Sequence, residues 1–246
     1  MRSKVFITGV SRGLGYALAR EALARGFPTI GIGRHSAEDL DGHGDYQFIQ
    51  ADFADESSVQ SAAKQLCNHP GRIQLGILNA GMLNPIQDMV EASLEEVKKA
   101  MQINVWANKT LLDALLQTSE PPKQIVAISS GASQSGSRGW NAYAISKAAL
   151  NMLVQLYAAE ARETHFAAVA PGLVDTGMQE AIANTPDDPR FPKMRELKDA
   201  RGTAKMPTPQ ELAPQLWNIF SLLPKHHASG HYVDIRKITP EWSQTS

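Results

Sequence analysis

A tyrosine and a lysine four residues apart are the side chains best suited to proton transfer. Tyr143 and Lys147 lie within a helical pattern, so this spacing places them on one face of a helix. A free tyrosine has a pKa of about 10 and exchanges protons poorly at neutral pH. A nearby ammonium group favours the phenolate and lowers that pKa. The pair therefore predicts a general acid or base.

A serine hydroxyl is expected beside this pair. Ser130 ends a predicted strand and precedes Tyr143 by 13 residues. Its hydroxyl is suited to binding and polarising a carbonyl oxygen. Its neighbour Ser129 is the weaker candidate, because side chains alternate in direction along a strand. We therefore expect Ser130 to contact the substrate.

Strands and helices alternate along the chain. Apolar runs predict buried strands at residues 5–8, 29–33, 47–50, 73–78, 124–129, 166–170 and 231–235. Helices are predicted at 94–115, from Asn141 through Tyr157, from an N-cap at Asp55 to about Asn68, and from Glu211 to Leu223, where Pro224 should stop the last one. This alternation predicts one α/β domain over residues 1–246. It is of Rossmann type, with a doubly wound, mostly parallel seven-stranded sheet and helices on both faces.

One proline-rich, charged stretch interrupts this rhythm at residues 184–214. It is either a surface insertion or part of a mobile substrate lid, which would span about residues 177–210.

A glycine-rich turn follows the first strand. Gly9 permits the tight turn, Gly13 lets the backbone approach a pyrophosphate, and Gly15 allows the next helix to pack closely on the strand. The N-terminus of that helix offers backbone N–H groups to an anion. The turn therefore predicts a dinucleotide site.

The second strand ends at the position expected to face the adenosine ribose. An acidic residue there would bind a ribose 2′-hydroxyl, but the sequence has Arg34 followed by His35. A guanidinium group pairs well with a 2′-phosphate, and Arg12 in the glycine turn is placed to clamp the same group. These residues favour NADP(H). Asp52 and Phe53, after the third strand, are expected to face the adenine.

Five motifs in order resemble the short-chain dehydrogenase/reductase family over nearly the whole chain. Residues 8–15 match its TGxxxGxG turn, 79–81 its NAG signature, and 171–176 its PG-x-V-x-T stretch. Its catalytic tetrad, with the YxxxK motif, is matched by Asn104, Ser130, Tyr143 and Lys147.

This resemblance implies roles by position. Tyr143 protonates the carbonyl oxygen, Lys147 lowers the tyrosine pKa and holds the nicotinamide ribose, and Asn104 holds a water in a proton relay. The expected cofactor-binding residues are Gly9, Ser11, Arg12, Gly13, Leu14, Gly15, Arg34, Asp52, Phe53, Asn79, Ala80, Gly81, Tyr143, Lys147, Pro171, Gly172, Val174 and Thr176. The family also implies a homodimer or homotetramer formed through two long helices, with outward faces including Ala107, Leu111, Ala149 and Leu153.

Within the family, residues 129–143, 170–179 and 229–234 resemble sepiapterin reductases and microbial benzil reductases. Animal sepiapterin reductases anchor the pterin with a carboxylate near the C-terminus, where this chain has Lys237. An ammonium group cannot accept the N–H donors of a pterin. We therefore expect a vicinal dicarbonyl or another small ketone, bound by Ser130, Tyr143, Met178 and Trp140, although Trp140 also suits simple packing at a helix start.

Composition argues against several other classes. A net charge of −1 without charge blocks disfavours nucleic acid, and no apolar run is long enough for a membrane span. The lone Cys67 suggests neither a disulfide nor a metal site, and the sequence before the first strand has no signal-peptide pattern, so we expect a cytoplasmic enzyme. Two alternatives remain: an NADP-binding regulatory or sensor protein, and an alcohol dehydrogenase working oxidatively.

Overall fold

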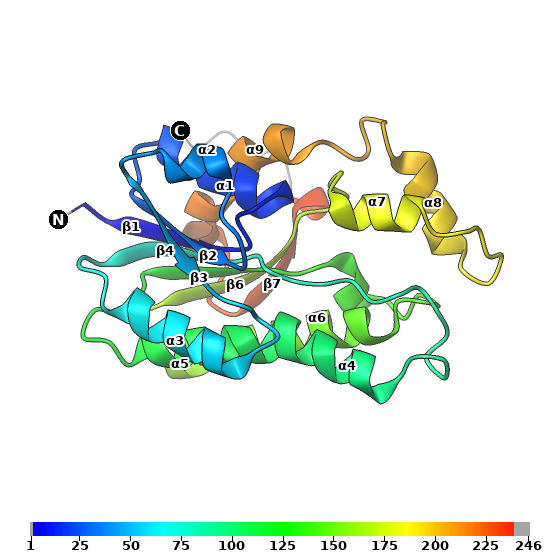
Figure 1. Ribbon diagram of the computed structural model, residues 1–246, viewed down its shortest axis with the longest axis horizontal. Coiled ribbons are helices and arrows are strands. Elements are labelled where there is room, and N and C mark those ends of the chain that lie inside the picture. Colours follow the sequence, from blue (N-terminus) through cyan, green and yellow to red (C-terminus); the bar gives the residue numbers. More distant parts are fainter. Residues whose placement is uncertain (1, 239–246) are drawn as a thin grey trace.

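Seven parallel strands form one sheet at the centre of the protein (Figure 1), whose computed structural model describes residues 2–238. In sheet order they are β3 (Tyr46–Gln50), β2 (Thr29–Gly33), β1 (Lys4–Thr8), β4 (Ile73–Leu78), β5 (Gln124–Ile128), β6 (His165–Ala170) and β7 (His231–Asp234). The predicted Rossmann-type sheet is confirmed, and every pairing in it is parallel. Residues 1 and 239–246, which the predicted domain includes, lie outside the described residues.

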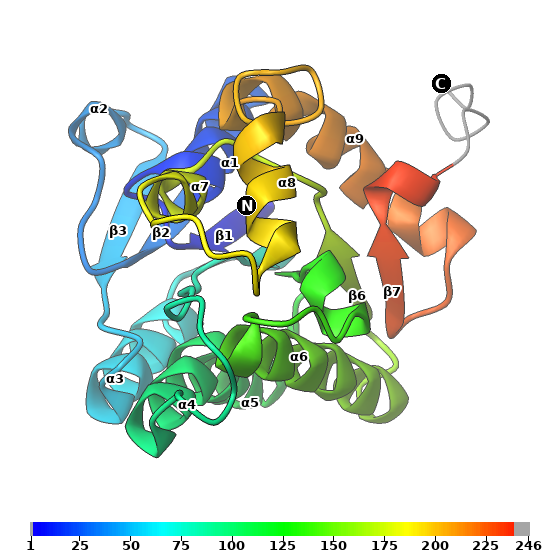
Figure 2. The same ribbon diagram turned by 90° about the vertical axis from the view of Figure 1, so that its right-hand side faces the viewer.

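Helices cover both faces of this sheet, as the views in Figures 1 and 2 show. One face carries α1 (Gly13–Ala24) and α9 (Pro209–His226), and the other carries α3 (Glu56–Cys67), α5 (Ala107–Leu116) and α6 (Asn141–Glu160). Successive strand residues alternate between the faces, so Val5 and Ile7 join one hydrophobic cluster while Phe6 joins the other. This double burial explains the continuous apolar runs in the sequence.

Shorter helices occur in the connections between these strands and long helices. They are α2 (Glu38–Asp41), α4 (Leu94–Met101), α7 (Gly177–Ala183) and α8 (Pro192–Ala200), and a π-helical turn over Gln102–Trp106 joins α4 to α5. The predicted N-cap of α3 is confirmed, because the Asp55 carboxylate accepts a hydrogen bond of 2.9 Å from the Ser57 backbone. No described helix combines the length and hydropathy that spanning a bilayer needs.

The last helix does not stop at Pro224, as the sequence had suggested, but runs on to His226. Proline lacks the N–H that would bond to the carbonyl four residues earlier, here that of Phe220. In the structure the Gln124 side chain supplies the missing donor, with its Nε2 atom 2.9 Å from the Phe220 oxygen. A buried hydrogen bond from β5 therefore compensates for the proline.

A second correction concerns the outward faces of α5 and α6. Ala107 and Leu111 are fully buried rather than exposed, because that side of α5 packs toward α3 and the sheet. Ala149 and Leu153 are half-buried. On α6 and the π-helical turn before α5, the large apolar side chains that face outward are Trp106, Ile145, Met152 and Leu156, each 46–53% exposed.

The compensation of Pro224 can be tested through the free energy of unfolding. Gln124→Met would leave the Phe220 carbonyl buried without its donor and should lower this free energy by about 1–3 kcal/mol. In a Pro224→Ala background the helix regains its own N–H donor, so the same substitution should cost less. Urea denaturation of the natural protein, the two single variants and the double variant measures both losses of unfolding free energy. Equal losses in the two backgrounds would show that Gln124 does not compensate for Pro224.

Candidate active site

A cavity of about 1240 Å³ opens along the carboxyl edge of the sheet, lined by the segments that follow the strands. Parallel strands place all of these segments at one edge. Among the expected site residues, those lining the cavity are Gly9, Ser11, Arg12, Gly13, Leu14, Arg34, Asp52, Phe53, Asn79, Ala80, Gly81, Ser130, Trp140, Tyr143, Lys147, Pro171, Gly172, Val174, Thr176 and Met178. Gly15 and Asn104 lie behind its wall.

The glycine turn after β1 has the shape that its sequence suggested. Gly9 and Gly13 have φ angles of 77° and 62°, which disfavour other residues. A Cβ atom on Gly15 would lie 2.2 Å from the Gly9 oxygen and 2.4 Å from Asn79 Nδ2, so any larger residue would collide there. The turn thus presents backbone, rather than side chains, at the start of α1.

Asn79, after β4, holds this turn from the neighbouring strand. Its Nδ2 atom donates to the carbonyls of Thr8 and Gly9, at 2.9 and 3.2 Å. In return the buried Thr8 hydroxyl accepts the backbone N–H groups of Asn79 and Ala80, both at 2.9 Å. The floor of the cavity between β1 and β4 is therefore fixed by four hydrogen bonds.

Cationic side chains gather at the β2 end of the cavity. Arg34 and His35 line it directly after β2, and Arg12 lines it from the glycine turn. The Arg12 guanidinium lies against the start of α7, with its Cζ atom 3.8 Å from the Cβ position of Gly177. Asp52 is exposed at the end of β3, whereas Phe53 is only 6% exposed and belongs to the core cluster on that face. Two guanidinium groups therefore line the cavity.

Tyr143 and Lys147 lie one turn apart on α6, and the Lys147 Nζ atom is 5.9 Å from the centroid of the Tyr143 ring. Lys147 also donates a 2.7 Å hydrogen bond to the Ile128 carbonyl at the end of β5. Burial lowers the pKa of Lys147 to about 8. Burial also raises the pKa of Tyr143, and a hydrogen bond with the Ser130 side chain lowers it in part.

Burial thus favours the protonated form of Tyr143, which is the form required of a general acid. The lowering of the Tyr143 pKa by the Lys147 ammonium stays a prediction.

Ser129 and Ser130 follow the end of β5 and both line the cavity, but their hydroxyl groups have different partners. The buried Ser129 hydroxyl donates to Asn151 Oδ1 at 2.6 Å, whereas the Ser130 side chain bonds to Tyr143. Asn151 in turn donates to the Ser133 hydroxyl at 2.8 Å, and Ser133 donates to the Ser130 carbonyl at 2.7 Å. This network behind Ser130 was not predicted, although Asn151 lies one helical turn beyond Lys147 on the same face.

Asn104 supports the cavity from behind. It is fully buried in the π-helical turn, and its carboxamide bonds to the backbone N–H and carbonyl of Met82, at 2.8 and 3.0 Å, and to the Ser146 hydroxyl at 2.9 Å. A Cβ atom on Gly81 would lie 3.2 Å from its Oδ1 atom and 3.5 Å from Lys147 Nζ. Asn104 thus connects the segment after β4 to α6, while its role in holding a water stays a prediction.

The mouth of the cavity has a small hydrophobic cluster of its own. It joins Trp140 to residues of α7 and α8 and the loop between them, and its buried members are Trp140, Ile182, Phe191, Met194 and Leu197. Trp140 is 9% exposed, lines the cavity, and lies 6.1 Å from Tyr143 between ring centroids. Both interpretations of Trp140, packing and access to a ligand, therefore agree with its position.

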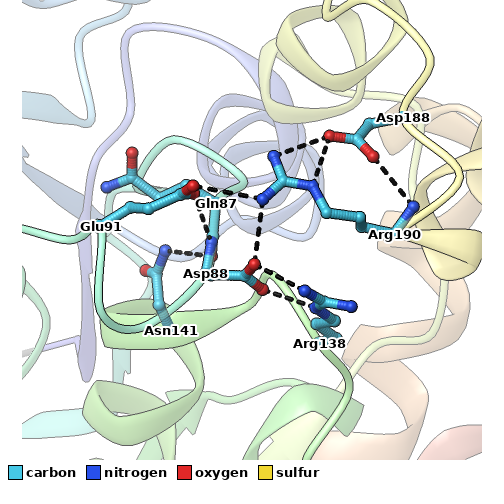
Figure 3. Close-up of polar contacts among 7 residues, drawn as sticks. All are labelled: Gln87, Asp88, Glu91, Arg138, Asn141, Asp188 and Arg190. Carbon is cyan, nitrogen blue, oxygen red and sulfur yellow. Dashed lines mark hydrogen bonds and ion pairs between the residues drawn. The ribbon is translucent and has the colours of Figure 1, made fainter.

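Ion pairs tie the loop between α7 and α8 to the body of the protein, and Figure 3 shows them. Arg190 contacts Asp88 and Glu91 at 3.0 and 3.2 Å, and Asp188 of its own loop at 2.8 Å. Arg138 pairs with the same Asp88 at 2.6 Å. This Arg190 clasp joins segments that lie 50 and 102 residues apart in the chain.

The C-terminal side of the cavity differs from the sequence-based expectation. Arg236 lines the cavity, whereas Lys237, the residue singled out from the sequence, does not. Both belong to the 3-10 turn over Ile235–Lys237 after β7. Their order in the turn decides which side chain faces inward, so a cation remains at this end but one residue earlier than expected. Within residues 2–238, no three His, Cys, Asp or Glu side chains are grouped to hold a metal ion.

Known proteins resemble this chain in sequence and in fold. Residues 3–187 match the short chain dehydrogenase family. A benzil reductase ((S)-benzoin forming) of Bacillus subtilis is 29% identical over 242 residues, covering 94% of this chain and 97% of that protein. An NADPH-dependent pterin aldehyde reductase of Arabidopsis thaliana is 33% identical over 181 residues, covering 70% and 75%. The crystal structure of a short chain dehydrogenase/reductase from Saccharomyces cerevisiae is 25% identical with a TM-score of 0.80, covering 98% of each chain.

Proposed function

Because the chain belongs to the short-chain dehydrogenase family of oxidoreductases, we propose that it reduces a small ketone or vicinal dicarbonyl with NADPH. The observation that carries this proposal is the convergence of Ser130, Tyr143 and Lys147 on a cavity that also contains the glycine turn. The names of the Bacillus and Arabidopsis relatives support carbonyl reduction as the direction of the reaction.

The cavity offers partners to both charged groups of NADP(H), the pyrophosphate and the 2′-phosphate. The glycine turn and the N-terminus of α1 would hold the pyrophosphate, because the turn lines the cavity and presents backbone N–H groups there. Arg34 and Arg12 would pair with the 2′-phosphate. We assign the remaining cofactor contacts to the lining residues predicted from the sequence. When bound, the reduced nicotinamide supplies a hydride to the carbonyl carbon.

The side chains of the protein would supply the proton. As the carbonyl π bond breaks, its electron pair moves to oxygen, and Tyr143 donates its phenolic proton to that oxygen. Ser130 holds the same oxygen by a hydrogen bond, and the Lys147 ammonium stabilises the phenolate that remains on Tyr143. Asn104 holds the segment that carries Gly81 against α6, which carries Lys147. A water bound to Asn104 would relay the proton that restores the Tyr143 hydroxyl.

Tyr143→Phe tests the assigned acid. The substitution removes only the hydroxyl, so NADPH binding should persist while turnover of a diketone such as benzil falls by about 10²–10⁴-fold. NADPH oxidation followed at 340 nm measures turnover, and calorimetry measures binding. Unchanged turnover in the variant would refute the assignment. Tight NADPH binding by the natural protein without turnover on any carbonyl would favour a sensor protein instead.

Arg34→Leu tests the cofactor preference. Loss of charge-assisted hydrogen bonds to a 2′-phosphate should raise KM for NADPH by about tenfold or more and leave KM for NADH nearly unchanged. Arg20→Leu is the matched control, because Arg20 is exposed on α1 and does not line the cavity. Equal effects of Arg34→Leu on the two cofactors would contradict a role in 2′-phosphate binding.

We also propose that residues 177–210 act as a lid over the substrate. Its helices α7 and α8 extend beyond the carboxyl edge of the sheet (Figures 1 and 2), and contribute Met178, Ile182 and Leu197 to the cavity wall. The Arg190 clasp and the burial of Phe191 would hold the lid down, while the exposed edges of its ion pairs allow opening.

Arg190→Leu should loosen this lid. Exposed ion pairs contribute up to about 1 kcal/mol, so the open population should rise by up to about fivefold. Leu197 is 5% exposed in the closed lid and is followed by Lys198, so chymotryptic cleavage after it reports opening. Arg162→Ala is the control, because Arg162 lies far from the clasp on the loop after α6. Cleavage at an unchanged rate in Arg190→Leu would show that the clasp does not hold the lid.

We propose that the protein is a homodimer through the exposed stripe of Ile145, Met152 and Leu156 on α6, together with Trp106. Apolar side chains at intervals of seven and four residues form one face of a helix, and their burial against a second copy would remove this surface from water. Sedimentation equilibrium of the purified protein separates a dimer from a tetramer.

A further inference from the structure

The two side chains of one ion pair at the cavity wall, Arg236 and Asp234, differ in their exposure. Arg236 donates to the Asp234 carboxylate through Nε and Nη2, at 2.9 and 2.6 Å. The Asp234 side chain is only 5% exposed, whereas that of Arg236 is 56% exposed. The Asp234 carboxylate is therefore buried behind the Arg236 side chain, and the Arg236 side chain lines the cavity.

Arg236 lies at the catalytic end of this cavity. Its Nη2 atom is 3.3 Å from the Cβ position of Gly131, the residue that follows Ser130. Its Cγ and Cδ atoms are 3.4 Å from the Cβ position of Gly172, which also lines the cavity. Two glycines thus make room for the arginine beside the serine that is proposed to hold the reacting carbonyl.

The pair with Asp234 leaves hydrogen-bond donors available to a ligand. A guanidinium group has five N–H donors, and Asp234 takes one on Nε and one on Nη2. The two bonds also fix the plane of the group, so little rotamer freedom remains to be lost on binding. The hydrogen bonds to Asp234 further raise the pKa of Arg236, which keeps it charged. The guanidinium group, with three N–H donors not taken by Asp234, therefore lies beside the residue that follows Ser130.

We propose that Arg236 determines specificity by binding a second oxygen of the substrate, next to the carbonyl that is reduced. This inference rests on the proposed function and extends it to a substrate class, the carbonyl compounds with a vicinal oxygen acceptor. The acceptor is either the neutral oxygen of a 1,2-diketone or the carboxylate of a 2-oxo acid, since a guanidinium group binds both. Ser130 and Tyr143 hold one oxygen, and Arg236 holds the other.

A pair of substrates that differ in one oxygen isolates this contact. Benzil has two adjacent carbonyls, and deoxybenzoin replaces one of them with a methylene group. In Arg236→Met, kcat/KM for benzil should fall on the order of tenfold further than for deoxybenzoin, as expected for loss of one charge-assisted hydrogen bond. Benzoylformate distinguishes the two acceptors, because a loss larger than that for benzil identifies a carboxylate as the preferred group.

Two further variants serve as controls. Lys237→Met removes a neighbouring cation that does not line the cavity, so the benzil-to-deoxybenzoin ratio should stay that of the natural protein. Arg236→Lys keeps the charge and should recover part of the ratio. Thermal unfolding and NADPH binding show whether each variant folds. An equal loss on benzil and deoxybenzoin in Arg236→Met would overturn the proposal and leave Arg236 a structural partner of Asp234.

The same ratio can be measured without turnover, which separates this inference from the proposed function. Dissociation constants of benzil and deoxybenzoin in the complex with NADP⁺ report the Arg236 contact even if no carbonyl is reduced. A benzil preference that disappears in Arg236→Met supports the contact. Failure of benzil to bind more tightly than deoxybenzoin to the natural protein would overturn it, whatever the turnover.

Discussion

The tie between Thr8 and Asn79 is the constraint on which the rest of the site depends. The chain leaves β1 toward β2 on one side of the sheet and leaves β4 toward β5 on the other, so a crevice opens where β1 and β4 end side by side. Backbone groups beside this crevice must find hydrogen-bond partners. The Thr8 hydroxyl accepts two N–H groups from the β4 end, and the Asn79 carboxamide donates to two carbonyls of the glycine turn. The strand ends are thereby held at a fixed separation without filling the crevice. The glycine turn, the start of α1 and the segment that leads to Asn104 are all placed relative to this floor.

Burial shifts the pKa values of the two titratable side chains proposed to handle the proton. Lys147 is a nearly buried cation whose pKa falls to about 8, and its hydrogen bond to the Ile128 carbonyl offsets part of the cost of burying it. Burial raises the pKa of Tyr143 for the same reason, because it disfavours the phenolate. The chain of hydrogen bonds from Ser129 through Asn151 and Ser133 returns to the Ser130 backbone, so side chains of the protein position the serine proposed to hold the carbonyl.

The body of the protein and the segment over the cavity are held by different interactions. Two large hydrophobic clusters, one on each face of the sheet, hold the scaffold, and a third small cluster around Trp140 and Phe191 holds the segment over the cavity. That segment is fastened by half-exposed ion pairs, which are weak compared with core packing. A rigid floor with a lightly held cover suits a site that must exclude water during reaction and still exchange its ligands.

The amino-acid sequence by itself determined the strands, their order of alternation with helices, the glycine turn, and the grouping of Ser130, Tyr143 and Lys147. The strands and helices follow from local periodicity and the glycine turn from its motif, while the grouping follows because a parallel sheet brings the ends of all its strands to one edge. Only the tertiary structure decided which side chains face inward at particular positions. Arg236 rather than Lys237 lines the cavity, Ala107 and Leu111 pack into the core, and Asn104 lies behind the wall. The helix continues through Pro224 because Gln124, 96 residues before Phe220, supplies the missing donor. Each of these outcomes depends on contacts between segments remote in the chain, for which a local pattern carries no signal.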